Sequence, residues 1–182
     1  MSLLSIIKSL RPKKPPTCTA VIAAAGLSQR CKGEDKLFYN INNKPILAYT
    51  LEPFQNSNLI NDIIIVSCED RYEYISEICL KYGFSKVSKV IRGGQTRLES
   101  VLNGVYAASS KAGLLAIHDG ARPCTGIDLI EKTIHAAAIY NAAAPAVAVT
   151  STIKKLMLRS YLKQSTDRIY LKSKHRKYSK LN

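Results

Sequence analysis

The chain has 182 residues, of which 46% are hydrophobic, and a formal net charge of +14. This length suits one domain whose core needs neither a disulfide nor a metal to hold it. No apolar stretch is long enough to span a membrane, and no small-residue cleavage site follows the first ten residues. We therefore expect a cytoplasmic protein without a membrane partner. The five cysteines form no C-x-x-C pair, which favours reduced thiols.

The positive charge lies at the two ends of the chain. Residues 1–17 carry four cations and no acidic residue, and their proline-rich second half predicts a stiff, extended leader. Residues 151–182 carry ten cations against Asp167 alone. The residues between these ends are nearly neutral, so nucleic-acid binding would be a property of the tails and not of the folded domain. We expect no nucleic-acid partner.

The first loop of the chain has the composition of a polyphosphate-binding loop. An apolar run at residues 20–23 predicts a buried strand, and the small residues Ala24, Ala25 and Gly26 follow it directly. Arg30 and Lys36 add positive charge shortly afterwards, beside backbone N–H groups that small side chains leave accessible. A plain tight turn followed by solvated cations is the alternative. Neither G-x-x-x-x-G-K-[ST] nor G-x-G-x-x-G is present, which disfavours a P-loop ATPase and a dinucleotide dehydrogenase.

Strands and helices alternate along the rest of the chain. Further strands are expected at residues 62–67, 89–91, 114–117 and 144–149. Helices are expected after a start at 43–45, at about 71–82, after the glycines at 93 and 94, and at about 128–140. The residues expected to pack from two of these helices are Tyr74, Ile75, Ile78 and Leu80, then Val101, Leu102, Val105 and Tyr106. The alternation predicts a parallel α/β sandwich with right-handed crossovers.

Two further stretches fall where a ligand site is expected. Gly93 and Gly94 come just before a helix, a place suited to an anion or to a base lying against backbone, although a plain strand-to-helix loop is the alternative. Asp119 and Arg122 follow a strand, and ligands of open parallel sheets bind at the carboxyl ends of strands. Asp119 could hold Mg²⁺ together with substrate phosphates, or it could cap the loop or pair with Arg122.

Three motifs together resemble one family. The first contains Ala24, Ala25 and Gly26 with Arg30 and Lys36, the second runs from residue 92 to 101, and the third is residues 118–123. In order and spacing they are similar to the 2-C-methyl-D-erythritol 4-phosphate cytidylyltransferase family. The resemblance runs from about residue 19 to 154. It implies a three-layer, Rossmann-like nucleotidyltransferase sandwich with a mostly parallel sheet.

The resemblance also implies a reaction and a set of roles. An oxygen of methylerythritol phosphate would attack the α-phosphate of CTP, and pyrophosphate would leave, with Mg²⁺ and the catalytic residues Arg30 and Lys36 neutralising charge. The residues that would bind the nucleotide are Ala24, Ala25, Gly26, Gly94, Ser100, Asp119, Gly120 and Arg122, with Asp119 also at the metal. Thr152 and Arg168 look like the residues that would hold the acceptor phosphate, Arg168 by reaching across a homodimer.

The C-terminal part departs from the family pattern. Beyond Arg168, the family's closing strand and helices are replaced by the basic residues 169–182, so the sheet is expected to be incomplete at this end. We interpret this as a truncated or frame-shifted product, with a short variant that binds an acidic partner as the alternative. The expected divisions are a leader at 1–17, a nucleotidyltransferase domain at 18–155, and a dimer-arm remnant with the tail at 156–182.

Two other functions remain open at this stage. A relative acting on ribitol phosphate or another polyol phosphate would share the cytidine-binding half, so the acceptor is not fixed by these motifs. A catalytically impaired chain that binds RNA or a membrane surface through its basic ends is the second alternative, and its binding would depend strongly on salt.

Overall fold

A four-stranded parallel sheet forms the centre of the fold. The computed structural model describes residues 16–26, 35–147, 152–155 and 170–173. The strands of this sheet are β1 (Cys18–Ala23), β4 (Ile60–Ser67), β5 (Val87–Arg92) and β6 (Leu114–Asp119), in the order β5-β4-β1-β6. All three pairings are parallel. The apolar runs that predicted β1 and β4 are buried on both faces, as strands covered by helices must be.

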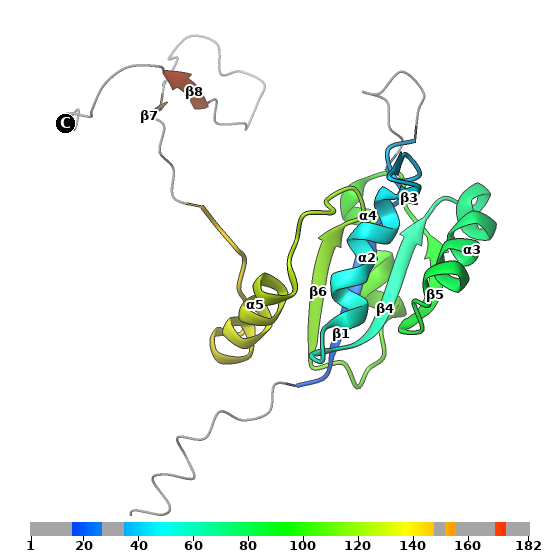
Figure 1. Ribbon diagram of the computed structural model, residues 1–182. Helices are drawn as coiled ribbons and strands as arrows, with labels where there is room; N and C mark the ends of the chain where they lie inside the picture. The colour runs from blue at the N-terminus through cyan, green and yellow to red at the C-terminus, as the bar shows by residue number, and fades with distance from the viewer. Residues whose placement is uncertain (1–15, 27–34, 148–151, 156–169, 174–182) are drawn as a thin grey trace, which may run out of the picture. The chain divides into compact units, whose positions relative to one another are not determined.

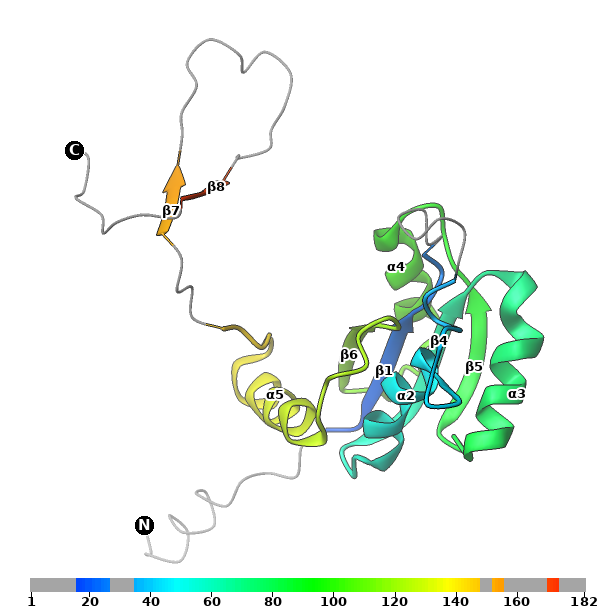
Figure 2. The same cartoon turned by 45° about the horizontal axis from the view of Figure 1, so that its top comes forward.

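Helices cover both faces of this sheet (Figures 1 and 2). They are α2 (Ile46–Asn56), α3 (Tyr72–Tyr82), α4 (Arg97–Ala107) and α5 (Ile127–Tyr140), and a 3-10 turn, η1 (Glu69–Arg71), precedes α3. The larger core cluster joins α2, α3 and α5 to one face, through residues such as Leu51, Ile75 and Ile134. On the other face, α4 covers a smaller cluster of Val21, Ile64 and Val66. The predicted three-layer sandwich is confirmed.

The order of the strands creates a switch point between β1 and β6. From β1 the chain moves outward through β4 to β5, and it then returns by way of α4 to pair β6 with the opposite side of β1. In such doubly wound sheets a crevice opens at the carboxyl ends of the two strands on either side of the switch point. Those ends are Ala23 and Asp119, which are paired in register.

The sequence predicted a strand at residues 144–149, and residues 144–147, the part of it that the structure describes, do not form one. Residues 142–147 have no regular secondary structure, and residues 148–151 lie outside the described part of the chain. Pro145 cannot donate to a ladder, and the alanines around it offer little apolar surface to bury. Within the described part of the chain β6 is therefore an outer strand of the four-stranded sheet, and Leu115 and Ile117 on it are 38% and 40% exposed.

The helix faces differ in part from those expected. Ile75 and Ile78 of α3 are buried as predicted, but Leu80 is 84% exposed. On α4 the buried residues are Ser100 and Gly104, whereas Leu102 and Tyr106 are exposed. The reason lies at Gly104, where a Cβ would overlap the side chain of Val21. The helix therefore approaches the sheet through its small residues, and the larger apolar side chains point away.

A short hairpin before α2 was not anticipated from the sequence. Strands β2 (Asn40–Ile41) and β3 (Lys44–Pro45) pair antiparallel around Asn42 and Asn43, which have φ values of 50° and 60°. Two consecutive left-handed residues suit a tight hairpin turn, and asparagine tolerates that conformation well. The helix expected from residues 43–45 accordingly starts at Ile46, with Pro45 as its N-cap.

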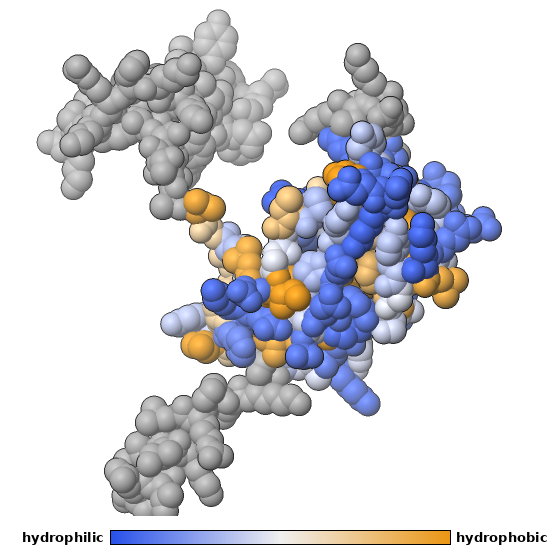
Figure 3. Space-filling model, viewed as in Figure 1, coloured by the Kyte–Doolittle hydropathy of each residue, from blue (hydrophilic) through white to orange (hydrophobic). Residues whose placement is uncertain are grey.

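The contacts of the chain divide it into two units, Met1–Ala144 and Pro145–Asn182. In the second unit β7 (Thr152–Lys155) pairs antiparallel with β8 (Tyr170–Ser173). No helix in the described part of the chain is both long enough and apolar enough to cross a membrane. Figure 3 shows apolar atoms at the surface of α5, whose exposed residues include Leu129, Ile139 and Tyr140.

Burial of Cys18 predicts a pH-dependent stability. The Cys18 side chain is buried at the start of β1, and this burial raises the pKa of its thiol from 9.0 to about 11. In the unfolded chain the thiol ionises near pH 9, so stability present below pH 9 is lost as the pH rises to 11. We expect this loss to approach about 2 kcal/mol. Urea unfolding of the wild type and Cys18→Ala at pH 8 and pH 10.5 measures it, because only the wild type should show this component.

Candidate active site

A cavity of about 650 Å³ opens at the carboxyl ends of the four parallel strands. This volume is within the range of small-ligand sites. All four strands contribute to its wall at or just after their last residues. The described residues that line it are Ala23, Ala24, Ala25, Gly26, Lys36, Leu37, Cys68, Gly94, Gln95, Thr96, Arg97, Ser100, Asp119, Ala121 and Arg122.

The loop after β1 is held by backbone contacts with its neighbours. The Ala24 N–H donates to the Val66 carbonyl at 2.7 Å, which extends the pairing of β1 with β4 by one residue. A Cβ added at Gly93 would overlap the Ala25 side chain, so the two small-residue loops lie in direct contact. A larger side chain at Gly93 or Ala25 would push the two loops apart and would occupy space beside the cavity.

Ser100 holds the glycine turn against the start of α4. Its side chain is buried; the hydroxyl accepts a hydrogen bond from the Gly94 N–H at 3.1 Å and donates one to the Thr96 carbonyl at 3.0 Å. Thr96 and Glu99 form a capping box at the same helix end. The turn is thus fixed by side chains from the first turn of the helix that follows it.

Asp119 lies between two arginines at the edge of the cavity. Its Oδ1 accepts hydrogen bonds from Nε and Nη2 of Arg97, at 2.9 and 2.7 Å, and its Oδ2 lies 2.9 Å from Nε of Arg122. Both guanidiniums are largely exposed. The carboxylate therefore holds two cations beside the cavity, in the positions where an anionic ligand would meet them.

Gly120, which was expected to bind the nucleotide, lies behind the loop that follows β1. It is buried and is not part of the cavity wall. Its N–H donates to the Ala23 carbonyl at 2.8 Å, and its carbonyl accepts from the buried Thr50 hydroxyl at 2.8 Å. An added Cβ would lie only 3.2 Å from the Ala24 Cβ. Gly120 therefore supports the Ala24 loop from behind.

Most of the site residues expected from sequence come together in this cavity. Those in its wall are Ala24, Ala25, Gly26, Lys36, Gly94, Ser100, Asp119 and Arg122. Arg30 and Arg168 lie outside the described residues, and Thr152 belongs to β7 in the second unit. Wall residues that were not singled out include Cys68 and Arg97. Arg97 was within a recognised motif, but its pairing with Asp119 is a tertiary contact that no local pattern reveals.

Comparison with known proteins identifies the family. A family model described as 2-C-methyl-D-erythritol 4-phosphate cytidylyltransferase matches residues 18–175. The chain belongs to this family. A member from Clostridium botulinum (strain Loch Maree / Type A3) is 43% identical over 137 residues, which are 75% of this chain and 60% of that protein. A member from Clostridium acetobutylicum is 42% identical over 151 residues, 82% of this chain and 66% of that protein.

The chain spans about 60 to 66% of the length of these two cytidylyltransferases. Its fold also matches solved members of the family. The 4-diphosphocytidyl-2C-methyl-D-erythritol synthase of Anaerococcus prevotii aligns with a TM-score of 0.58 and 28% identity, over 68% of this chain and 51% of that one. The α/β architecture that the alternation of strands and helices predicted, and that the resemblance implied, is therefore the architecture of the cytidylyltransferase family.

Proposed function

We propose that this chain transfers CMP from CTP to 2-C-methyl-D-erythritol 4-phosphate and releases pyrophosphate, a step of non-mevalonate isoprenoid synthesis. The observation that carries the proposal is the meeting of all three family motifs around one cavity of nucleotide size, at the switch point of the sheet. A phosphate oxygen of the acceptor attacks the α-phosphorus of CTP, a new P–O bond forms there, and the bond to the pyrophosphate oxygen breaks.

The proposed roles follow from charge and position. Lys36 is in the cavity wall, and it would neutralise charge that builds up on the α-phosphate during transfer, together with Arg30. Arg122 would leave Asp119 and contact the phosphates instead, because the triphosphate carries more negative charge than one carboxylate. Small residues at 24–26 would let phosphate oxygens approach backbone N–H groups. Gly94 and Ser100 would line the cytosine end, where backbone lies close to the cavity.

The donor set of the site is compatible with one divalent cation bound jointly with a nucleotide. Asp119 is the one carboxylate among the described wall residues, and Mg²⁺ commonly uses one or two carboxylates plus phosphate oxygens. The contacts with Arg97 and Arg122 engage three of its roughly four acceptor positions. We propose that Asp119 would hold Mg²⁺. The ion would supply charge neutralisation of the phosphates.

The acceptor side of the reaction is proposed from the family. Thr152 would contact the phosphate of methylerythritol phosphate, and Arg168 would reach it from the second subunit of a homodimer. The pairing of β7 with β8 is compatible with an arm of this kind, since two antiparallel strands form an extended ribbon. The proposed partners are CTP, the polyol phosphate and a second copy of the chain.

Calorimetry with CTP and Mg²⁺, followed by a pyrophosphate-release assay, tests this function. We expect saturable CTP binding, and pyrophosphate release that requires methylerythritol phosphate. Release with ribitol 5-phosphate but not with methylerythritol phosphate would replace the proposed acceptor. Absence of CTP binding by a folded protein would contradict the nucleotide site itself. CTP binding without release with either acceptor would contradict the transfer activity of this chain.

A further inference from the structure

Arg71 lies behind the cavity wall and contacts both sides of the first loop. It is the last residue of η1, and its side chain is only 11% exposed. Nη1 donates to the Ala24 carbonyl at 3.1 Å, and Nη2 lies 2.8 Å from Oδ2 of Asp35. Ala24 precedes residues 27–34 in the chain and Asp35 follows them. One guanidinium thus joins the two ends of this loop.

Asp35 in turn fixes the backbone on both sides of Lys36. Its Oδ1 accepts a hydrogen bond from the Leu37 N–H at 3.2 Å, and its carbonyl accepts one from the Phe38 N–H at 3.1 Å. Leu37 is buried in the core, and its carbonyl accepts from the Leu47 N–H at 2.9 Å. The position of the Lys36 backbone is therefore set by Asp35 on one side and by the core on the other.

The Arg71 guanidinium also lies over the aromatic ring of Phe38. Its central carbon lies 5.8 Å from the centre of the Phe38 ring, which packs edge-on against Tyr74 at 4.7 Å. A partly buried arginine with a charged partner, a carbonyl acceptor and a ring has little freedom to rotate. The two terminal nitrogens, Nη1 and Nη2, therefore set the distance between the Ala24 carbonyl and the Asp35 carboxylate. A lysine could reach one partner but could not replace both contacts.

We infer that Arg71 is a positioning residue of the nucleotide site, which acts through Ala24 and Asp35 to place the backbone at Ala24 and at Lys36 for phosphate binding. This inference rests on the proposed function, since it gives the site's ligand as the CTP triphosphate. Arg71 is not among the described residues that line the cavity, so it would act on the ligand only through Ala24 and Asp35. A purely structural role would instead stabilise the fold without changing nucleotide affinity.

The test compares Arg71→Met, Arg71→Lys and Asp35→Asn with the wild type. Arg71→Met keeps the apolar stem, and Asp35→Asn keeps an acceptor for the Leu37 N–H but removes the charge. We expect Arg71→Met and Asp35→Asn to weaken CTP binding about tenfold or more in calorimetry, because small displacements of phosphate-binding groups are costly. Arg71→Lys should recover part of the affinity. The double variant Arg71→Met/Asp35→Asn should bind CTP little more weakly than either single variant, because both substitutions remove the same contact.

Glu69→Gln is the matched control. Glu69 lies in the same 3-10 turn and forms an exposed ion pair with Arg92, at 3.4 Å. This variant should bind CTP like the wild type, because exposed pairs contribute little. Should Arg71→Met fail to fold, Asp35→Asn supplies the comparison.

Hydrogen exchange of the nucleotide-free protein separates this inference from the proposed function. Exchange at the Leu37 amide should accelerate in Arg71→Met and Asp35→Asn, and it should not change in Glu69→Gln. If the wild type binds no CTP, the proposed function fails, and faster exchange at the Leu37 amide would still show that Arg71 fixes Asp35 and Leu37. If Arg71→Met folds and binds CTP as the wild type does, Arg71 is not a positioning residue, whatever the exchange result.

Discussion

Lys36→Ala is expected to lower turnover by a factor of about one hundred to one thousand without altering the fold. The lysine is in the cavity wall, next to Asp35 and Leu37, which fix its backbone. An ammonium aimed at a phosphate contributes most when negative charge builds up during transfer, so its removal should reduce kcat more than it weakens substrate binding. Alanine removes this charge and leaves the backbone contacts of the turn in place.

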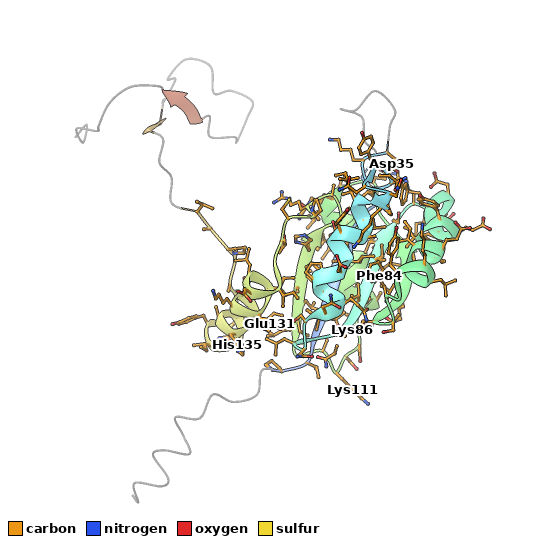
Figure 4. The ribbon with its side chains drawn as sticks, in the orientation of Figure 1. Asp35, Phe84, Lys86, Lys111, Glu131 and His135 are labelled. Carbon is orange, nitrogen blue, oxygen red and sulfur yellow. The ribbon has the colours of Figure 1, made fainter. Side chains whose placement is uncertain are left out.

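Pyrophosphate release under saturating CTP and methylerythritol phosphate measures this effect, with thermal melting as the check on folding. Lys111→Ala is the matched control, since Lys111 is exposed and precedes β6. Figure 4 shows Lys111 and Asp35 at opposite ends of the four-stranded sheet. The control should turn over like the wild type. A folded Lys36→Ala protein with an almost unchanged rate would rule out the proposed catalytic role.

Ile65→Ala should lower the free energy of unfolding by about 3 to 4 kcal/mol. Ile65 is fully buried in the middle of β4, between Ile22 of β1 and Val90 of β5. Truncation removes apolar contacts in a region where three strands and the overlying helices meet, and a sheet cannot collapse far to fill the space. The space left by the missing side chain would also loosen the pairing of β1 with β4, and this pairing places the loop residue Ala24.

Urea unfolding measures this loss, and Leu80→Ala is the control. Leu80 is an apolar residue of similar size, but it is exposed on α3, so its truncation should change stability by less than about 0.5 kcal/mol. A similar loss in both variants would contradict the assignment of the core to the sheet and to the inner faces of the helices.

Much of the fold follows from local patterns in the sequence. The β-branched run at residues 62–67 predicted β4, and the small residues at 24–26 after an apolar run predicted the loop that lines the cavity. These predictions hold because the strands are buried on both faces, which leaves a clear apolar signal. The failure at residues 144–147 has a local cause as well, since Pro145 among alanines is a poor strand sequence.

Other features could not be read from local patterns because they depend on tertiary contacts. The apolar residues of α4 suggested a packing face, but the close approach at Gly104 turns Leu102 and Tyr106 outward. The pairs Arg97 with Asp119 and Arg71 with Asp35 join residues far apart in the chain. Charged residues at such separations carry no periodic signal, so these two pairs became visible only in three dimensions. The pair of Asp119 with Arg122 joins residues three apart, and the sequence had offered it as an alternative.

The position of β1 in the sheet has a consequence for biosynthesis. This strand is translated before one of its two neighbours, β6, which is made of residues 114–119. Until those residues have been translated, one edge of β1 is open and Asp119 is missing from the cavity. β1 can pair with β4, and β4 with β5, before β6 is available. The nascent chain must therefore protect an apolar strand edge between the translation of β1 and that of β6.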